Sequence, residues 1–87
     1  MDNILEAEAN KPKNCCGPRI RLARRRTSPQ VSQQDLVARL ETYGININQG
    51  MLSKIENQAR PVTDIELKAI GEALAISVAW LIREREM

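Results

Sequence analysis

Residues 48–57, with the sequence NQGMLSKIEN, constrain the fold of this chain more than any other segment. Placed on a helix with about 100° per residue, the segment divides into two faces. The apolar face consists of Met51, Leu52 and Ile55. The other face is narrow and polar, and it consists of Gln49, Gly50, Ser53, Lys54 and Asn57. The pattern predicts an amphipathic helix that packs one side on a domain and exposes an amide, a hydroxyl and an ammonium on the other.

Helix-start signals and apolar stripes predict two helices before this segment. Gly17-Pro18 begins the first, over about Pro18 to Arg26, because proline suits the first helical turn. Ser32 and Asp35 have the spacing of a capping box and begin the second, which Gly44 ends in a left-handed conformation. The apolar residues of that second helix recur at a helical period and are Leu36, Val37, Leu40 and Tyr43.

The later part of the chain predicts the remaining helices. Asn48 can cap the helix over residues 48–57. Thr63 and Glu66 repeat the capping-box spacing, and Ser77 is a third N-cap candidate. No segment alternates with the period of a strand. We therefore expect an all-α bundle of five short helices.

Length and composition bound the size and surroundings of this bundle. Eighty-seven residues form one small domain, and a chain that is 43% apolar without any Phe must have an aliphatic core. Residues 1–16 lack a helical stripe, so they predict a flexible leader before a domain over residues 17–87. No apolar run approaches about 18 residues, and the N-terminus is acidic, unlike a secretory signal. We expect a cytoplasmic protein that does not bind membranes.

The net charge of +2 hides a basic block. Residues 11–26 contain seven Lys and Arg and no acid, whereas residues 1–10 contain three acids and no base. Such a block is typical of phosphate contact or of a merely solvated arm, and composition favours neither.

Catalytic and metal-binding groups are scarce. There is no His, and the only cysteines are the neighbours Cys15 and Cys16, which cannot easily close a disulfide. Reduced thiols are the favoured interpretation, and a reactive vicinal pair is the alternative. No nucleophile has a base beside it, and no metal site has enough ligands. We expect no enzyme, no metal, no cofactor and no small-molecule ligand.

Three stretches together resemble a known family: VSQQDLVARL (31–40), MLSKIEN (51–57) and RPVTDIELKAIGEALAISVAWLI (60–82). Residues 20–82 resemble the Cro/C1-type (XRE family) helix-turn-helix domain, the lambda-repressor-like fold of phage and bacterial regulators. The resemblance implies a repressor-like five-helix bundle whose helix 48–57 enters the major groove. It implies a transcriptional regulator that binds double-stranded DNA at specific sequences. Such a regulator acts as a homodimer on a pseudo-palindromic site.

The chain departs from the family pattern in four ways, which include a longer link with Pro29 between the first two helices and Val37 where the family prefers Ala. Leu40 is followed by a long link, so we expect one extra turn in the second helix, with Ile45 and Ile47 beneath it. Gly50 stands where many members have a base-reading side chain. It can let the helix approach closely or simply be tolerated.

The resemblance implies base contacts from Gln49, Gly50, Ser53 and Lys54. A glutamine amide can donate to N7 and accept from N6 of adenine, which is worth about 1–3 kcal/mol of discrimination. Lys54 could reach guanine or a phosphate. The alternative is that these residues form a solvated helix face with no binding role.

The residues implied to contact phosphate are Gln33, Asn48, Asn57, Arg60 and Arg25. Asn57 is equally compatible with a left-handed residue at the end of the helix. Trp80, on the last helix, suits the core or a dimer contact.

Glu56 lies between the two faces of its helix, where phosphates would repel a carboxylate that pointed outward. It should therefore point inward to a cation. Arg24 matches the family's partner for it and stands four residues after Ile20 on the inward face of the first helix. We expect this ion pair to be structural.

Two rival functions stay open. A protein-interaction adaptor could keep the helix-turn-helix fold without reading DNA. RNA or single-strand binding is poorly supported, because Tyr43 and Trp80 are the only aromatic rings available for stacking.

Overall fold

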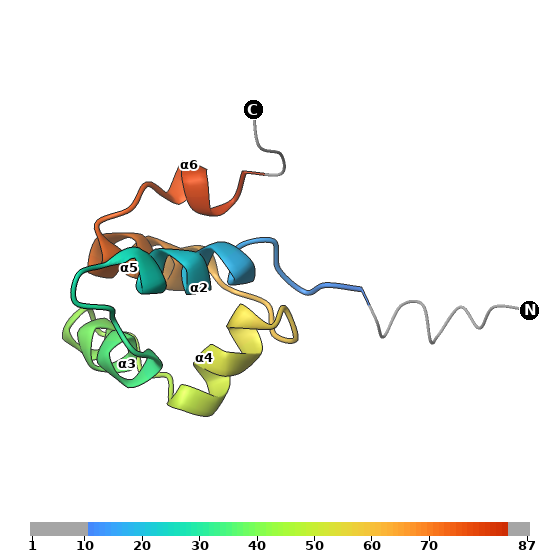
Figure 1. The fold of residues 1–87 in the computed structure, drawn as a ribbon. Coiled ribbons are helices and arrows are strands. Elements are labelled where there is room, and N and C mark those ends of the chain that lie inside the picture. Colours follow the sequence, from blue (N-terminus) through green and yellow to red (C-terminus); the bar gives the residue numbers. More distant parts are fainter. Residues whose placement is uncertain (1–10, 84–87) are drawn as a thin grey trace, which may run out of the picture.

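The computed structural model describes residues 11–83, and all regular structure in that range is helical (Figure 1). The helices are α2 (Gly17–Arg26), α3 (Gln33–Thr42), α4 (Gln49–Glu56), α5 (Asp64–Leu74) and α6 (Val78–Leu81). The prediction of five short helices without a strand is confirmed for this range. None of these helices is long and apolar enough to span a bilayer.

Four helices begin at the side chains that the sequence predicts as N-caps. Each of these side chains accepts a hydrogen bond from a backbone N–H in the first turn, and they are Ser32, Asn48, Thr63 and Ser77. In α3 and α5 the side chain of the third helical residue, Asp35 or Glu66, in turn accepts a hydrogen bond from the backbone N–H of the capping residue. These reciprocal bonds fix where α3 and α5 start.

Helix α2 starts one residue earlier than predicted, and a side chain outside the helix caps it. Asn14 Oδ1 accepts from the backbone N–H groups of Cys16 and Gly17, at 3.1 and 2.8 Å. The helix begins at Gly17 because these two donors are already satisfied.

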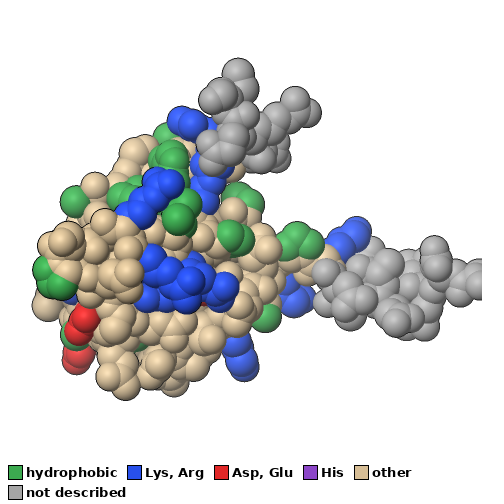
Figure 2. Space-filling view, in the orientation of Figure 1, with side chains coloured by type: hydrophobic (Ala, Val, Ile, Leu, Met, Phe, Trp, Pro, Cys, Tyr) green, Lys and Arg blue, Asp and Glu red, His purple; other side chains and the backbone are tan. Residues whose placement is uncertain are grey.

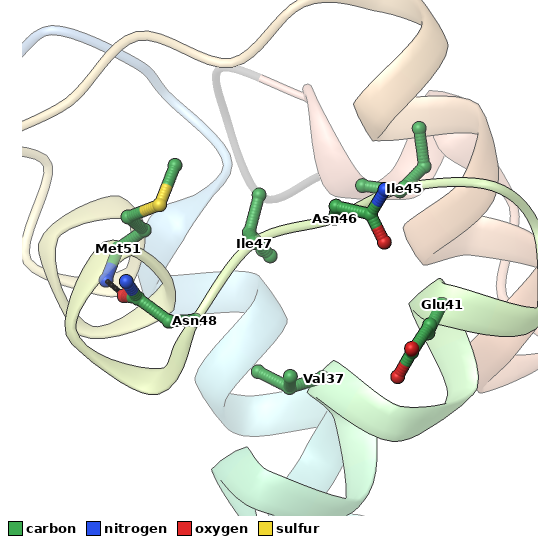
Figure 3. Close-up of a pocket in the computed structure, with 7 residues that line it drawn as sticks. All are labelled: Val37, Glu41, Ile45, Asn46, Ile47, Asn48 and Met51. Carbon is green, nitrogen blue, oxygen red and sulfur yellow. Dashed lines mark hydrogen bonds between the residues drawn. The ribbon is translucent and has the colours of Figure 1, made fainter.

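The long link between α3 and α4 contains a left-handed glycine. Gly44 has φ of 81°, as its predicted role as a helix stop requires. After it, Ile47 is buried and Ile45 is half-buried against the core, as expected. A hollow of about 320 Å³ lies beside this link, and Val37 and Glu41 of α3 and Met51 of α4 line it together with residues of the link (Figure 3).

The core is aliphatic, as the composition predicts. Its largest fully buried apolar side chains come from every helix and are Ile20, Leu36, Leu40, Leu52, Ile55, Ile70 and Leu81. Helix α3 packs against α4 and α5, α2 packs against α4 and α5, and α6 packs on α5. Helix α4 thus lies at one side of the molecule, below α2 in Figure 1, with its apolar residues turned into the core.

The later part of the expected leader is packed on the bundle, which corrects the boundary at residue 16. The Lys13 N–H donates to the Gln58 carbonyl at 2.9 Å, and Gln58 Nε2 donates to the Asn14 carbonyl at 2.8 Å. Cys16 is buried in the core. Backbone pairing and burial therefore place residues 13–16 with the helices. The rest of the leader prediction, over residues 1–10, and the last four residues of the expected domain lie outside the described residues.

Candidate functional site

A buried ion pair joins α2 to the end of α4. Arg24 Nε donates to Glu56 Oε2 at 2.6 Å, and Arg24 Nη2 donates to Glu56 Oε1 at 2.7 Å. The third guanidinium nitrogen, Nη1, donates to the Val31 carbonyl at 2.9 Å. Arg24 is 7% exposed and Glu56 is 2% exposed. The expected ion pair is thus bidentate and buried, and Arg24 also hydrogen-bonds to the loop before α3.

Glu56 stays ionised despite its burial. Removal from water raises the pKa of this carboxyl, but hydrogen bonds from Arg24, Gln33 and Arg21 oppose that effect. The donors prevail, and the pKa of Glu56 lies below its ordinary value. The carboxylate is therefore a fixed negative charge beneath the polar surface of α4.

A chain of hydrogen bonds through three glutamine side chains connects this carboxylate to the surface. Gln33 Nε2 donates to Glu56 Oε1 at 3.1 Å, and Gln49 Nε2 donates to Gln33 Oε1 at 3.3 Å. Gln34 Nε2 donates to Gln49 Oε1 at 3.1 Å. A carboxylate can only accept, so Glu56 fixes which end of the Gln33 amide faces it. That choice leaves the Gln33 oxygen toward Gln49 and orients the Gln49 amide in turn.

The outer face of α4 is polar and open, as its two-face pattern predicts. Gln49, Gly50 and Lys54 are exposed, and Ser53 is half-buried. The Lys54 side chain makes no hydrogen bond or ion pair with the described residues, although the Lys54 carbonyl accepts from the Ala59 N–H. The four residues expected to contact bases thus lie on one helix, and three of them face solvent.

Asn48 and Gln33 lie at the N-termini of α4 and α3. Asn48 Oδ1 accepts from the Met51 N–H at 2.8 Å, which leaves its amide nitrogen able to donate outward. Gln33 is half-buried because it contacts Glu56 and Gln49. Both positions can present N–H groups to an anion.

Asn57 is engaged by an arginine of α2. Arg21 Nη2 donates to Asn57 Oδ1 at 2.6 Å, while Arg21 Nε lies 3.4 Å from Glu56 Oε1. Asn57 has φ of −90°, so the alternative of a left-handed Asn57 is wrong. Gln58 takes that conformation, with φ of 63°, because its side chain and carbonyl are both bonded to residues 13 and 14.

The basic side chains divide into paired and solvent-facing groups. Arg60 lies 3.4 Å from Glu66, and Arg19 stacks 5.1 Å from the centre of the Trp80 ring. Arg25 and Arg26 are exposed and make no ion pair within residues 11–83. Figure 2 shows Lys and Arg side chains gathered over α2 and toward α4, with acidic side chains only at one edge of that view.

Two residues that the sequence reasoning missed hold α4 in place. Asn14 Nδ2 donates to the carbonyls of Ile55 and Arg60, at 3.0 and 2.7 Å, while its oxygen caps α2. A Cβ on Gly17 would lie 2.3 Å from the Ile55 oxygen, so only glycine allows this approach of α2 to α4. The asparagine three residues before the helix start is a capping signal that could have revealed Asn14.

The cysteines differ in their surroundings. Burial, with the neighbouring Cys15 thiol, raises the pKa of Cys16 to about 11, so this thiol is protonated at neutral pH. Cys15 is exposed. Within residues 11–83 no group of three His, Cys, Asp or Glu side chains could hold a metal ion.

Comparison with protein-family models, with curated proteins and with solved structures gives no match to this chain.

Proposed function

We propose that this chain is a transcriptional regulator that binds double-stranded DNA at specific sequences, with a repressor-like helix-turn-helix formed by α3 and α4. The observation that carries the proposal is the outer face of α4. It exposes both the Gln49 amide, which Gln33 and through it Glu56 orient, and the Lys54 ammonium, which makes no ion pair within residues 11–83. A major groove is wide enough to admit a helix with these groups. Such a regulator would act in the cytoplasm as a homodimer, because one domain of this size contacts only a few base pairs.

In this proposal the hydrogen-bonded amides prepare Gln49 for a base. Its Nε2 donates one proton to Gln33 and keeps a second, and its Oε1 accepts from Gln34 and keeps a second lone pair. The remaining donor and acceptor suit the N7 and N6 edge of adenine. Ser53 and Lys54 follow one turn later, and Gly50 leaves room for close approach.

Phosphate contacts would hold the helix in register. Arg25 offers an exposed charge, and the N-terminal regions of α3 and α4 offer Gln33 and Asn48. Arg60 and Asn57 would contribute only by exchanging their partners Glu66 and Arg21 for DNA. These engaged side chains are the observation that favours the rival function, an adaptor that has kept the fold without reading DNA.

Selection of binding sites from a random duplex pool tests the proposal, and Gln49→Ala gives its sharpest form. The parent chain should select a defined site, and the variant should lose preference at one position in each half-site, by about 1–3 kcal/mol of discrimination. Gln30→Ala is the matched control, because Gln30 is an exposed glutamine outside α3 and α4. If the parent and Gln49→Ala selected the same site, Gln49 would not contribute to base recognition.

A further inference from the structure

Exposed apolar side chains lie where the C-terminal end of α3 meets α5. Ile65 is 69% exposed and Tyr43 is 47% exposed. They flank a shallow hollow of about 220 Å³ that is also lined by Lys68, Ala69 and Glu72. We call these five residues the α5 surface. Large apolar side chains gathered around a hollow are typical of a protein contact.

Two opposite charges accompany the apolar side chains. Lys68 and Glu72 are exposed, stand one helical turn apart on α5, and make no ion pair within residues 11–83. Each charge is therefore available to a partner.

We propose that the α5 surface binds the α5 surface of a second copy of this chain, with the two α5 helices antiparallel about a two-fold axis. Such an axis between Lys68 and Glu72 puts Lys68 of each copy opposite Glu72 of the other. Ile65 and Tyr43 then supply apolar contact on both sides of the axis. A two-fold contact must be self-complementary, and a surface with one charge of each sign about its centre meets that condition.

The other exposed apolar residue on a long helix does not meet this condition. Leu22 of α2 has Arg19, Arg25 and Arg26 at the neighbouring positions three and four residues away, and α2 contains no acid. A two-fold contact there would bring arginines against arginines.

The proposed contact leaves the polar face of α4 free. Tyr43 follows the C-terminal end of α3, whereas Gln33 begins that helix, and ten residues of helix span about 15 Å. The inference rests on the proposed function for its need of a dimer, and it names the surface that would form it.

A charge exchange tests the pairing. Sedimentation equilibrium of the full chain, without DNA, should show a dimer. Lys68→Glu alone and Glu72→Lys alone should each weaken it at least about tenfold, because each homodimer then opposes like charges twice. An equimolar mixture of the two variants should dimerise again, since every contact in the mixed pair joins Glu to Lys. Failure of the mixture to recover the dimer would overturn the proposed axis.

Substitutions of exposed apolar residues test the same contact independently of the charges. Ile65→Ser should also yield monomers, while Leu22→Ser, at the other exposed apolar site, should leave the dimer intact. A parent chain that is monomeric at high concentration, or a dimer lost only in Leu22→Ser, would contradict the inference. Duplex binding is measured in parallel. Salt-sensitive binding by a monomeric parent would contradict the dimer but would leave DNA binding, the other part of the proposed function, standing. The predicted dimer without duplex binding would contradict only DNA binding.

Discussion

Arg24→Ala is expected to lower the free energy of unfolding by about 3–5 kcal/mol. The variant removes both hydrogen bonds to a carboxylate that is 2% exposed, and it also releases the Val31 carbonyl. Gln33 and Arg21 cannot replace a two-pronged guanidinium, because their contacts are single and longer, at 3.1 and 3.4 Å. Urea unfolding followed by circular dichroism measures the loss.

Arg25→Ala is the matched control for this loss. Arg25 is the next residue on the same helix, but it is exposed and has no ion pair within residues 11–83. Its removal should change the free energy of unfolding by less than about 0.5 kcal/mol. A similar small change in Arg24→Ala would show that the buried pair contributes little.

The same comparison has a pH dependence whose sign follows from Glu56. The pKa of this carboxyl is lowered in the folded state, so the folded chain binds fewer protons than the unfolded chain. Its stabilisation is complete above the ordinary glutamate pKa of about 4.3 and is lost as the pH falls through the lower folded value. Without Arg24, burial of the carboxyl is less opposed, so the pKa of Glu56 should rise. The difference in stability between parent and Arg24→Ala should therefore narrow below about pH 4.

Gly17→Ala should cost about 3 kcal/mol of stability, at the upper end of the range for overpacked sites. The added Cβ would lie 2.3 Å from the Ile55 oxygen and 2.7 Å from the Glu56 oxygen, and both of these are backbone atoms. Relief requires α2 to move away from α4, which also stretches the contact between Arg24 and Glu56. Thermal and urea unfolding measure the effect.

Gly50→Ala is the control for this substitution, and it should change stability in the opposite direction. A Cβ at Gly50 meets only the Asn48 side chain, at 3.4 Å, and the position is exposed on α4. Alanine favours a helix over glycine by up to about 1 kcal/mol. Equal losses from both substitutions would show that the close approach at Gly17 is not the cause.

Local signals in the sequence predicted most of the helix boundaries. Ser32, Thr63 and Ser77 act within three residues of themselves, so their capping is legible from spacing alone. The inward direction of Glu56 followed from a different argument, that a carboxylate between two faces of a helix needs a cation, and the family resemblance then implied Arg24 as its partner. The structure contains that pair.

Contacts between distant segments were beyond the reach of these signals. Asn14 bonds residues 41 and 46 positions later in the chain, and nothing in the leader's composition marks this pairing. The same pairing explains why Gln58 rather than Asn57 is left-handed, and why residues 13–16 belong with the helices. The order of the amides from Glu56 through Gln33 to Gln49 likewise depends on how α3 and α4 pack.

The salt dependence of duplex binding tests the proposed function most directly. A fluorescently labelled random duplex should bind the parent chain near about 50 mM salt, and the affinity should fall at least tenfold by about 200 mM, linearly in the logarithm of salt concentration. Arg25→Ala should reduce that slope by about one unit for all sequences. Absence of salt-sensitive binding near about 50 mM would contradict the DNA-binding function and would favour the adaptor.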